Sequence, residues 1–266
     1  MNKSWQSPGV GVREWGCSGR VEFMNRALDA DELQSEFDAH ARRYDLLVGA
    51  NLGYHRDLRR AAARLGLREQ GGGQRVLDLG CGTGASTAAI LAAYPLATVV
   101  GADASGGMLA AARGKPWPGS VTFVQARAER LAAAGVRGPF DAIFAGYLLR
   151  NVADPDAVLA DLRTLLRPGG HLVLHDYTLD GRPLSRAVWT AVCWGVIIPA
   201  GLLATGRTGL YRYLWRSVLD FDRVGALRER LRDNGFTEVR AGSAGGWQRG
   251  VTHTVRGRRQ LDGGTA

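Results

Sequence analysis

The chain of 266 residues is poor in cysteine and shows no internal repeat. Its three cysteines, Cys17, Cys81 and Cys193, are widely spaced and form no CxxC or His-paired pattern, which excludes a disulfide framework and a thiolate metal site. The first twenty residues lack the apolar run of a signal peptide. We therefore expect reduced thiols, no metal ion and a cytoplasmic protein.

Lysine is nearly absent too, because 32 of the 34 basic residues are Arg. The formal net charge is +9, and from residue 206 to the end twelve Arg stand against six Asp and Glu, a balance of +6. An excess that follows an apolar stretch favours an anionic membrane surface over a nucleic-acid groove. An Arg-rich solvated surface explains the same counts equally well. No RNA-binding module is recognisable, so we expect no nucleic-acid partner.

The length suits one large domain with its own hydrophobic core. Residues 1–28 are rich in Gly and Ser with little periodicity, which predicts a flexible N-terminal arm. One apolar face predicts a helix in DELQSEFDAHARRYDLL, and a second helix is expected over residues 55–65. Residues 29–266 are then a single domain.

From Arg75 onward, short runs rich in Val, Ile and Leu alternate with segments of helix length. The expected strands are RVLDLG, ATVVGAD, VTFVQA, FDAIFAG and GHLVLHDY, with TEVRAG and GVTHTVRGR as two closing strands. Between them, Asp154 is the expected N-cap of a helix that Pro168 terminates, and a further helix spans residues 222–234. This alternation predicts an α/β fold with a doubly wound, largely parallel sheet of seven strands.

The segment RVLDLGCGTGAST is a strand that enters a helix through a glycine turn. Gly80, Gly82 and Gly84 let a ligand approach the backbone, and the helix N-terminus offers free amides. The same spacing also satisfies the dinucleotide fingerprint, so the loop alone is ambiguous. Asp78 separates the two interpretations, because an acid so close to the loop would repel a pyrophosphate and suits a cationic or zwitterionic ligand.

A second acid, Asp103, lies at the expected end of the next strand, 25 residues after Asp78. In that position a carboxylate can accept hydrogen bonds from both ribose hydroxyls. S-adenosylmethionine (SAM) meets both demands, since its ammonium and sulfonium groups tolerate acids that repel phosphate.

At this point the chain resembles the class I SAM-dependent methyltransferases, with a Rossmann-like sheet. More narrowly, it is similar to the C-methyltransferases of ubiquinone and menaquinone biosynthesis. The matching segments are FDAHARRYDLL, NLGYHRDLRR, VLDLGCGTG, VQARAE, LLRNVADPDAVL, LRPGG, YRYLWRS and the final GF-x-x-V. The resemblance implies SAM as cofactor and a lipophilic quinol, such as demethylmenaquinol, as methyl acceptor.

The resemblance also implies roles for single positions. It places Gly80, Gly82 and Thr83 at the methionine part of SAM, Asp103 at the ribose, and Met108 and Ala128 beside the adenine. The full set of expected SAM-binding residues is Asp78, Gly80, Gly82, Thr83, Gly84, Asp103, Ala104, Met108, Ala128 and Tyr44. Tyr44 fits simple core packing equally well. The sequence departs from the family at two expected contacts, with Arg127 in place of Asn and Gly146 in place of Ser.

Arg150 in LLRNV resembles the proposed catalytic arginine of the family. Its pKa is too high for a base, so the expected role is to stabilise a phenolate; a structural salt bridge is the competing explanation. Tyr213 is the second expected catalytic residue, and Tyr211, His55 and His175 are further candidates for the pocket.

Between Arg186 and Arg207 lie twenty residues without a charge, AVWTAVCWGVIIPAGLLATG, long enough to cross a bilayer. A transmembrane helix here would place the two closing strands on the far side of the membrane, away from the rest of the sheet. We therefore expect Pro199 and the glycines to break the stretch into two helices, within a lid insertion of about residues 183–220. Such a lid either gives an isoprenoid tail an apolar wall at the membrane surface or simply buries itself.

Other functions remain open at this stage. A natural-product methyltransferase that acts on O, N or C would share the fold and cofactor, and Arg127 and Gly146 count in its favour. An RNA methyltransferase and a SAM-binding protein without catalysis are further alternatives. Homo-oligomerisation is left undecided by the sequence.

Overall fold

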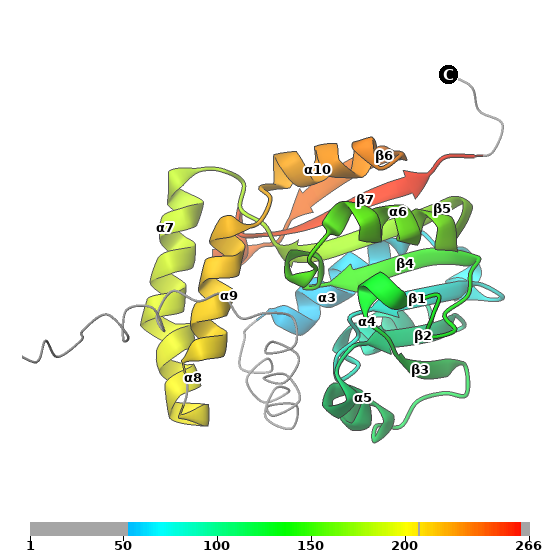
Figure 1. Ribbon diagram of the computed structural model, residues 1–266, viewed down its shortest axis with the longest axis horizontal. Coiled ribbons are helices and arrows are strands. Elements are labelled where there is room, and N and C mark those ends of the chain that lie inside the picture. The colour runs from blue at the N-terminus through cyan, green and yellow to red at the C-terminus, as the bar shows by residue number, and fades with distance from the viewer. Residues whose placement is uncertain (1–52, 207, 262–266) are drawn as a thin grey trace, which may run out of the picture.

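A computed structural model describes residues 53–206 and 208–261 of the chain. The expected N-terminal arm, the helix around residues 31–47 and Tyr44 lie outside the described residues. The seven strands are β1 (Arg75–Leu79), β2 (Thr98–Asp103), β3 (Val121–Gln125), β4 (Phe140–Gly146), β5 (Leu166–Tyr177), β6 (Phe236–Ser243) and β7 (Thr252–Arg259). They form one sheet in the order β3-β2-β1-β4-β5-β7-β6, in which only β7 runs antiparallel to its neighbours (Figure 1). The predicted doubly wound α/β fold is confirmed.

Helices connect and cover the strands. Those of eight or more residues are α3 (Tyr54–Ala62), α4 (Ala85–Ala93), α5 (Gly106–Arg113), α6 (Pro155–Leu165), α7 (Pro183–Val192), α8 (Ile198–Thr205), α9 (Gly209–Asp220) and α10 (Val224–Asp233). The short helical turns are η1 (Ala63–Leu65), η2 (Glu69–Gly71), η3 (Ala128–Arg130), η4 (Leu149–Asn151), η5 (Cys193–Ile197) and η6 (Gly246–Gln248). The predicted helix over residues 55–65 corresponds to α3 and η1, which end at Gly66 in the left-handed conformation.

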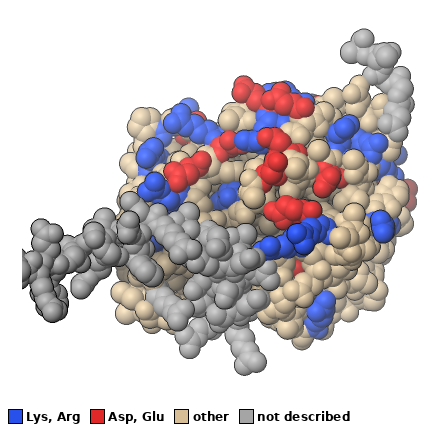
Figure 2. All heavy atoms as spheres, viewed as in Figure 1, with Lys and Arg blue, Asp and Glu red and all other residues tan. Residues whose placement is uncertain are grey.

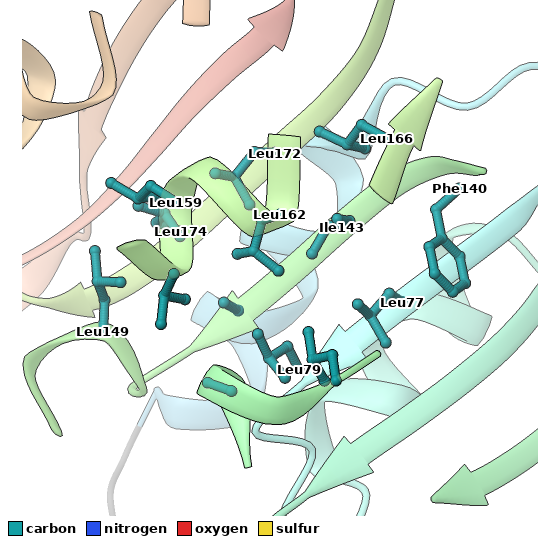
Figure 3. Close-up of a cluster of buried hydrophobic side chains, with 14 of the residues drawn as sticks. Leu77, Leu79, Phe140, Ile143, Leu149, Leu159, Leu162, Leu166, Leu172 and Leu174 are labelled. Carbon is teal, nitrogen blue, oxygen red and sulfur yellow. The ribbon is translucent and has the colours of Figure 1, made fainter. Parts of the chain in front are cut away.

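The core has two layers because successive strand residues point to opposite faces of the sheet. Leu172 and Leu174 of β5 belong to the cluster under α6 and α10, whereas Val173 between them faces the cluster under α3 and α4. Figure 3 shows the first cluster, where leucines of β1, β5 and α6 interdigitate. Burial on both faces explains why these strands are continuous apolar runs in the sequence.

Helix α6 begins where the sequence predicts. The side chain of Asp154 accepts hydrogen bonds from the backbone N–H groups of Asp156 (3.1 Å) and Ala157 (3.0 Å). The helix ends at Leu165, earlier than Pro168 suggests, because β5 already starts at Leu166. The chain therefore passes from helix to strand without a loop.

The apolar stretch is not broken into two helices, which corrects the prediction. Residues Pro183–Thr205 form one 23-residue helix, in which α7 and α8 are joined by the π-turn η5 and all flanking backbone angles are helical. Pro199 has no N–H to donate to the preceding turn, and a local π-turn accommodates this without ending the helix. Figure 1 shows α7 and α8 end to end, with α9 returning beside them beyond the end of the sheet.

Candidate functional site

A cavity of about 380 Å³ opens at the carboxyl ends of β1, β2 and β4. The strand order reverses between β1 and β4, and such switch points are where open α/β sheets bind ligands. Four segments form most of the wall: the loop after β1, the end of β2, the segment after β3 and the turn after β4. Tyr54 and Leu58 of α3 close one side. The volume is in the range of small-molecule sites.

The glycine loop presents its backbone to the cavity. Gly80 (φ 72°) and Gly82 (φ 53°) both have left-handed conformations that side chains rarely adopt. A Cβ on Gly82 would meet no protein atom within 4 Å, so a side chain there would extend into the cavity itself. The space left by the missing side chain is therefore available to a ligand.

Asp103 links this loop to the end of β2. Its Oδ2 accepts a hydrogen bond from the Gly82 N–H (2.8 Å), and its Oδ1 accepts one from the Ser105 N–H (2.9 Å). The side chain also lines the cavity, so its position is fixed before any ligand arrives. A carboxylate oxygen has more than one acceptor site and can bind a hydroxyl in addition.

Asp78 does not line the cavity, contrary to the expectation that it faces the ligand. Its side chain is fully buried below the loop, where Oδ2 accepts hydrogen bonds from Ser86 Oγ (2.8 Å) and Thr87 Oγ1 (2.6 Å) of α4. Burial raises the pKa of Asp78 to about 7, against a smaller lowering by these two bonds. Asp78 thus fixes the start of α4 beneath the loop.

Gly84 also lies away from the cavity. It precedes α4 with φ 92°, and a Cβ there would come within 2.6 Å of the Trp117 ring. The third glycine therefore serves packing against Trp117. Thr83 has both a cavity contact and a structural contact: it lines the cavity, and its carbonyl oxygen accepts a hydrogen bond from Lys115 Nζ (2.8 Å).

The remaining expected contacts meet at the cavity wall. Ala104, Met108 and Ala128 line it together with Gly80, Gly82, Thr83 and Asp103. The two departures from the family pattern, Arg127 and Gly146, are on the same wall. Segments from four parts of the sequence are thus gathered at one site.

Arg150 forms a buried ion pair with Asp176 and does not line the cavity. Its Nη1 also donates to the carbonyl oxygen of Tyr147 at 3.2 Å. Of the two explanations for Arg150, the structure shows the salt bridge. Tyr213 of α9 donates a hydrogen bond to Asn151 Oδ1 (3.2 Å), and Asn151 lines the cavity. Tyr213 therefore ties the insertion to the rim of the site.

The sequence reasoning missed Tyr147, which follows β4 and lines the cavity. It lies in the left-handed region (φ 55°), and its hydroxyl is 3.1 Å from His175 Nε2. Its position in the sequence could have indicated a role in the site, because a residue just after a parallel strand lies at the end of the sheet where ligands bind. Of the other candidates, His55 is exposed on α3, His175 is buried, and Tyr211 packs against Gly201 of α8.

Within residues 53–206 and 208–261, no group of three or more His, Cys, Asp or Glu side chains could hold a metal ion.

Comparisons with known proteins show which family the chain resembles. The model of the ubiE/COQ5 methyltransferase family matches residues 25–255. The chain is 35% identical over 232 residues to the ubiquinone/menaquinone biosynthesis C-methyltransferase UbiE of Syntrophotalea carbinolica, covering 85% of this chain and 94% of that protein. It is 34% identical over 220 residues to the demethylmenaquinone methyltransferase of Deinococcus radiodurans, covering 81% and 90%.

Among solved structures, phosphoethanolamine N-methyltransferase 2 of Haemonchus contortus, in complex with phosphomonomethylethanolamine and S-adenosylhomocysteine, is similar with a TM-score of 0.60. The two are 16% identical, over 84% of this chain and 58% of that one. At this identity the likeness shows the fold alone.

Proposed function

Because the chain belongs to the ubiE/COQ5 methyltransferase family and is a SAM-dependent methyltransferase, we propose that it methylates a ring carbon of a prenylated quinol of the demethylmenaquinol type. The observation that carries the proposal is the position of the cavity. It meets the apolar cluster of the insertion at Tyr147, which lines the cavity and packs against that cluster. A polar ring at the cavity and an apolar tail along α7–α9 match this arrangement.

The residues present fit SAM. The left-handed Gly82 leaves room for the ligand at the loop, and Asp103 is held ready for a ribose. We assign Gly80, Gly82 and Thr83 to the methionine part, Asp103 and Ala104 to the ribose, and Met108 and Ala128 to the adenine. When bound, SAM supplies a methyl group activated by its sulfonium. The protein contributes by aligning the acceptor carbon with that methyl and by excluding water.

We assign Arg150 a structural role next to the acceptor site. Its guanidinium is paired with Asp176, so it is not a free cation for a phenolate. It holds the turn after β4 through the Tyr147 carbonyl, next to the place where the acceptor must bind. Tyr213, through Asn151, connects this turn to the insertion.

We further propose that α7–α8 contacts an anionic membrane surface, where a prenylated substrate resides. By length and composition this helix could cross a bilayer, yet it is followed by α9, which returns with Arg212 and Arg216. Only 22% of its most apolar 18 residues is buried. A helix that lies in the plane of the membrane surface accounts for the exposed apolar side chains. It also keeps β6 and β7 on the same side of the membrane as the rest of the sheet.

The test is a methyl-transfer assay with the purified full chain, SAM and demethylmenaquinol kept reduced by borohydride. We expect methylated quinol by mass spectrometry and sharply reduced turnover with the Asp103→Ala variant. Binding of SAM without methylation of quinols across several tail lengths would contradict the substrate assignment.

A natural-product phenol is the second candidate acceptor. It is favoured by Arg127 and Gly146, which line the cavity and depart from the family pattern. Untailed phenols and indoles in the same assay decide between the two, since preferential turnover of these acceptors would support the second candidate.

A further inference from the structure

Tyr147 is held in an unusual conformation by several independent contacts. Its left-handed backbone (φ 55°) is fixed by its own N–H, which donates to the His175 carbonyl at 2.7 Å, and by two side chains that donate to its carbonyl. These are Arg150 Nη1 and Asn151 Nδ2, each at 3.2 Å. A strained residue that its surroundings hold this firmly is typical of a functional position.

The hydroxyl of Tyr147 is part of a polar chain that leads away from the cavity. It lies 3.1 Å from His175 Nε2, and His175 Nδ1 lies 3.0 Å from Thr254 Oγ1. His175 is buried, and burial, followed by the charges of Arg64 and His253, lowers its pKa to about 3. The imidazole is therefore neutral and has one N–H. With the proton on Nδ1 donated to Thr254, Nε2 accepts the proton of Tyr147.

The ring of Tyr147 stands where the cavity meets the apolar insertion. It stacks on Tyr54 at 5.4 Å and packs at 4.9 Å against Tyr177, whose ring in turn contacts Trp189 of α7. Tyr54 lines the cavity, whereas Tyr177 and Trp189 belong to the cluster under the insertion. An aromatic acceptor that enters between these two regions meets aromatic faces on which flat rings pack well.

We propose that Tyr147 binds the hydroxyl of the aromatic acceptor, accepting a hydrogen bond from it while donating its own to His175. The proposal rests on the methyl transfer proposed above. The acceptor hydroxyl keeps its proton and shares it with Oη in a hydrogen bond, which raises the electron density of the ring in the transition state. A carbon–carbon bond then forms as the carbon–sulfur bond of SAM breaks, and the displaced ring proton leaves to water. His175 and Thr254 take up no net proton and act as positioning residues.

Tyr147→Phe tests the proposal because it keeps the ring and removes only the hydroxyl. We expect kcat/KM for a hydroxyaryl acceptor to fall about 10- to 100-fold, the value of one hydrogen bond to a developing charge, with the Kd for SAM unchanged by calorimetry. The loss should shrink as the pH rises toward the pKa of the acceptor phenol, at about 10, since the ionised acceptor has no hydroxyl proton to donate to Oη. A structural defect would not depend on pH in this way. The matched control is Tyr94→Phe, whose hydroxyl bonds Ala63 and Gly66 away from the cavity and whose loss should leave kcat/KM unchanged.

A double-mutant cycle tests the positioning residues. Thr254→Val, which keeps the shape of the side chain, should lower kcat/KM in the wild-type background and have little effect when Tyr147 is already Phe. His175→Gln, which keeps an acceptor, provides a second variant if Thr254→Val does not fold.

The outcomes separate this proposal from the function. Equal loss from Thr254→Val in both backgrounds, or normal turnover by Tyr147→Phe at neutral pH, overturns the role of Tyr147 and leaves the methyltransferase assignment intact. If wild type methylates another phenol but no quinol, the quinol assignment fails and Tyr147 is tested with that phenol. If no hydroxyaryl compound is methylated, both fail.

Discussion

At the scale of single residues, Asp103 connects the loop, the sheet and the proposed ribose site. We expect Asp103→Ala to raise the Kd for SAM about 10- to 100-fold, because hydrogen bonds to a charged group are each worth about 1.5–3 kcal/mol. Calorimetry measures this directly. Asp154→Ala is a matched control, since Asp154 also accepts from two backbone amides but caps α6. It should cost about 1 kcal/mol of stability and leave SAM binding unchanged. An unchanged Kd in a folded Asp103→Ala protein would remove Asp103 from the site.

For Asp78 we predict an effect on the pH dependence of the free energy of unfolding. Its pKa is about 7 in the folded protein, against an ordinary value of 3.8, because burial penalises the charged form. Between about pH 4 and 7 the folded state keeps a proton that the unfolded chain has released, so this group destabilises the fold as the pH rises. Asp78→Asn removes the effect. Its free energy of unfolding relative to wild type should therefore increase over this window, by at most about 1.4 kcal/mol per pH unit.

The measurement is urea unfolding of both proteins at several pH values. His175 acts in the opposite direction, since its lowered pKa of about 3 makes the fold more stable as the pH rises toward 6.5. That contribution is present in both proteins and cancels in the difference. A difference that stays constant from pH 4 to 7 would show that Asp78 is ionised in the folded state.

The sequence predicted which segments line the cavity better than it predicted which side chains face it. Asp103 and Gly82 were predicted, because strand ends and glycine turns have local signatures. Asp78 was predicted on the wrong side of the loop, since the direction of a side chain depends on α4 packing over it. Tyr147 was missed because its conformation is fixed by Arg150, Asn151 and His175. Tertiary contacts of this kind leave no periodic pattern.

At the scale of elements, six of the seven strands were predicted to within two residues at each end, whereas β5 starts at Leu166, four residues before the predicted segment. Runs such as FDAIFAG are buried on both faces of a sheet, and glycine, proline or an N-cap lies close to their ends. The apolar stretch was harder, because Pro and Gly interrupt helices on average while a π-turn lets this one continue. Helix α9 packs along this stretch and approaches it closely at Gly201.

Gly201 is the point of that contact. A Cβ there would lie 2.2 Å from Tyr211 Cε2, so α8 and α9 can approach this closely only with glycine. Gly201→Ala should lower the free energy of unfolding by about 1–3 kcal/mol through overpacking. Gly195→Ala is the control in the same helix, because its Cβ would meet nothing within 4 Å and should leave stability equal or slightly higher. Equal stability of the two variants would show that α8 and α9 do not pack as described.

At the scale of the whole molecule, charge and apolar surface are separated. Figure 2 shows acidic and basic side chains intermixed over the face that carries α6 and α10, where Arg230 forms ion pairs with Asp156 and Asp222. Helix α8 contains no charged residue, and its Leu202 and Leu203 are exposed. The net charge of +9 therefore coexists with an apolar end, and charge alone does not predict where a lipid surface would be contacted.

Membrane contact is tested at that apolar end. Leu203 is 89% exposed and Leu202 lies beside it, while Arg182 and Arg186 are exposed at the other end of the helix. Apolar insertion and about 1 kcal/mol per arginine near an anionic surface should act together. We expect the protein to float with vesicles that contain phosphatidylglycerol and much less with pure phosphatidylcholine. Replacing both leucines by Ser should reduce binding about tenfold or more. Leu96→Ser is the control, because Leu96 is also 60% exposed but precedes β2, at the amino ends of the parallel strands and away from α7–α8 (Figure 1). If wild type stays soluble with anionic vesicles, or if Leu96→Ser weakens binding equally, α7–α8 is not the contact and its apolar surface has another partner.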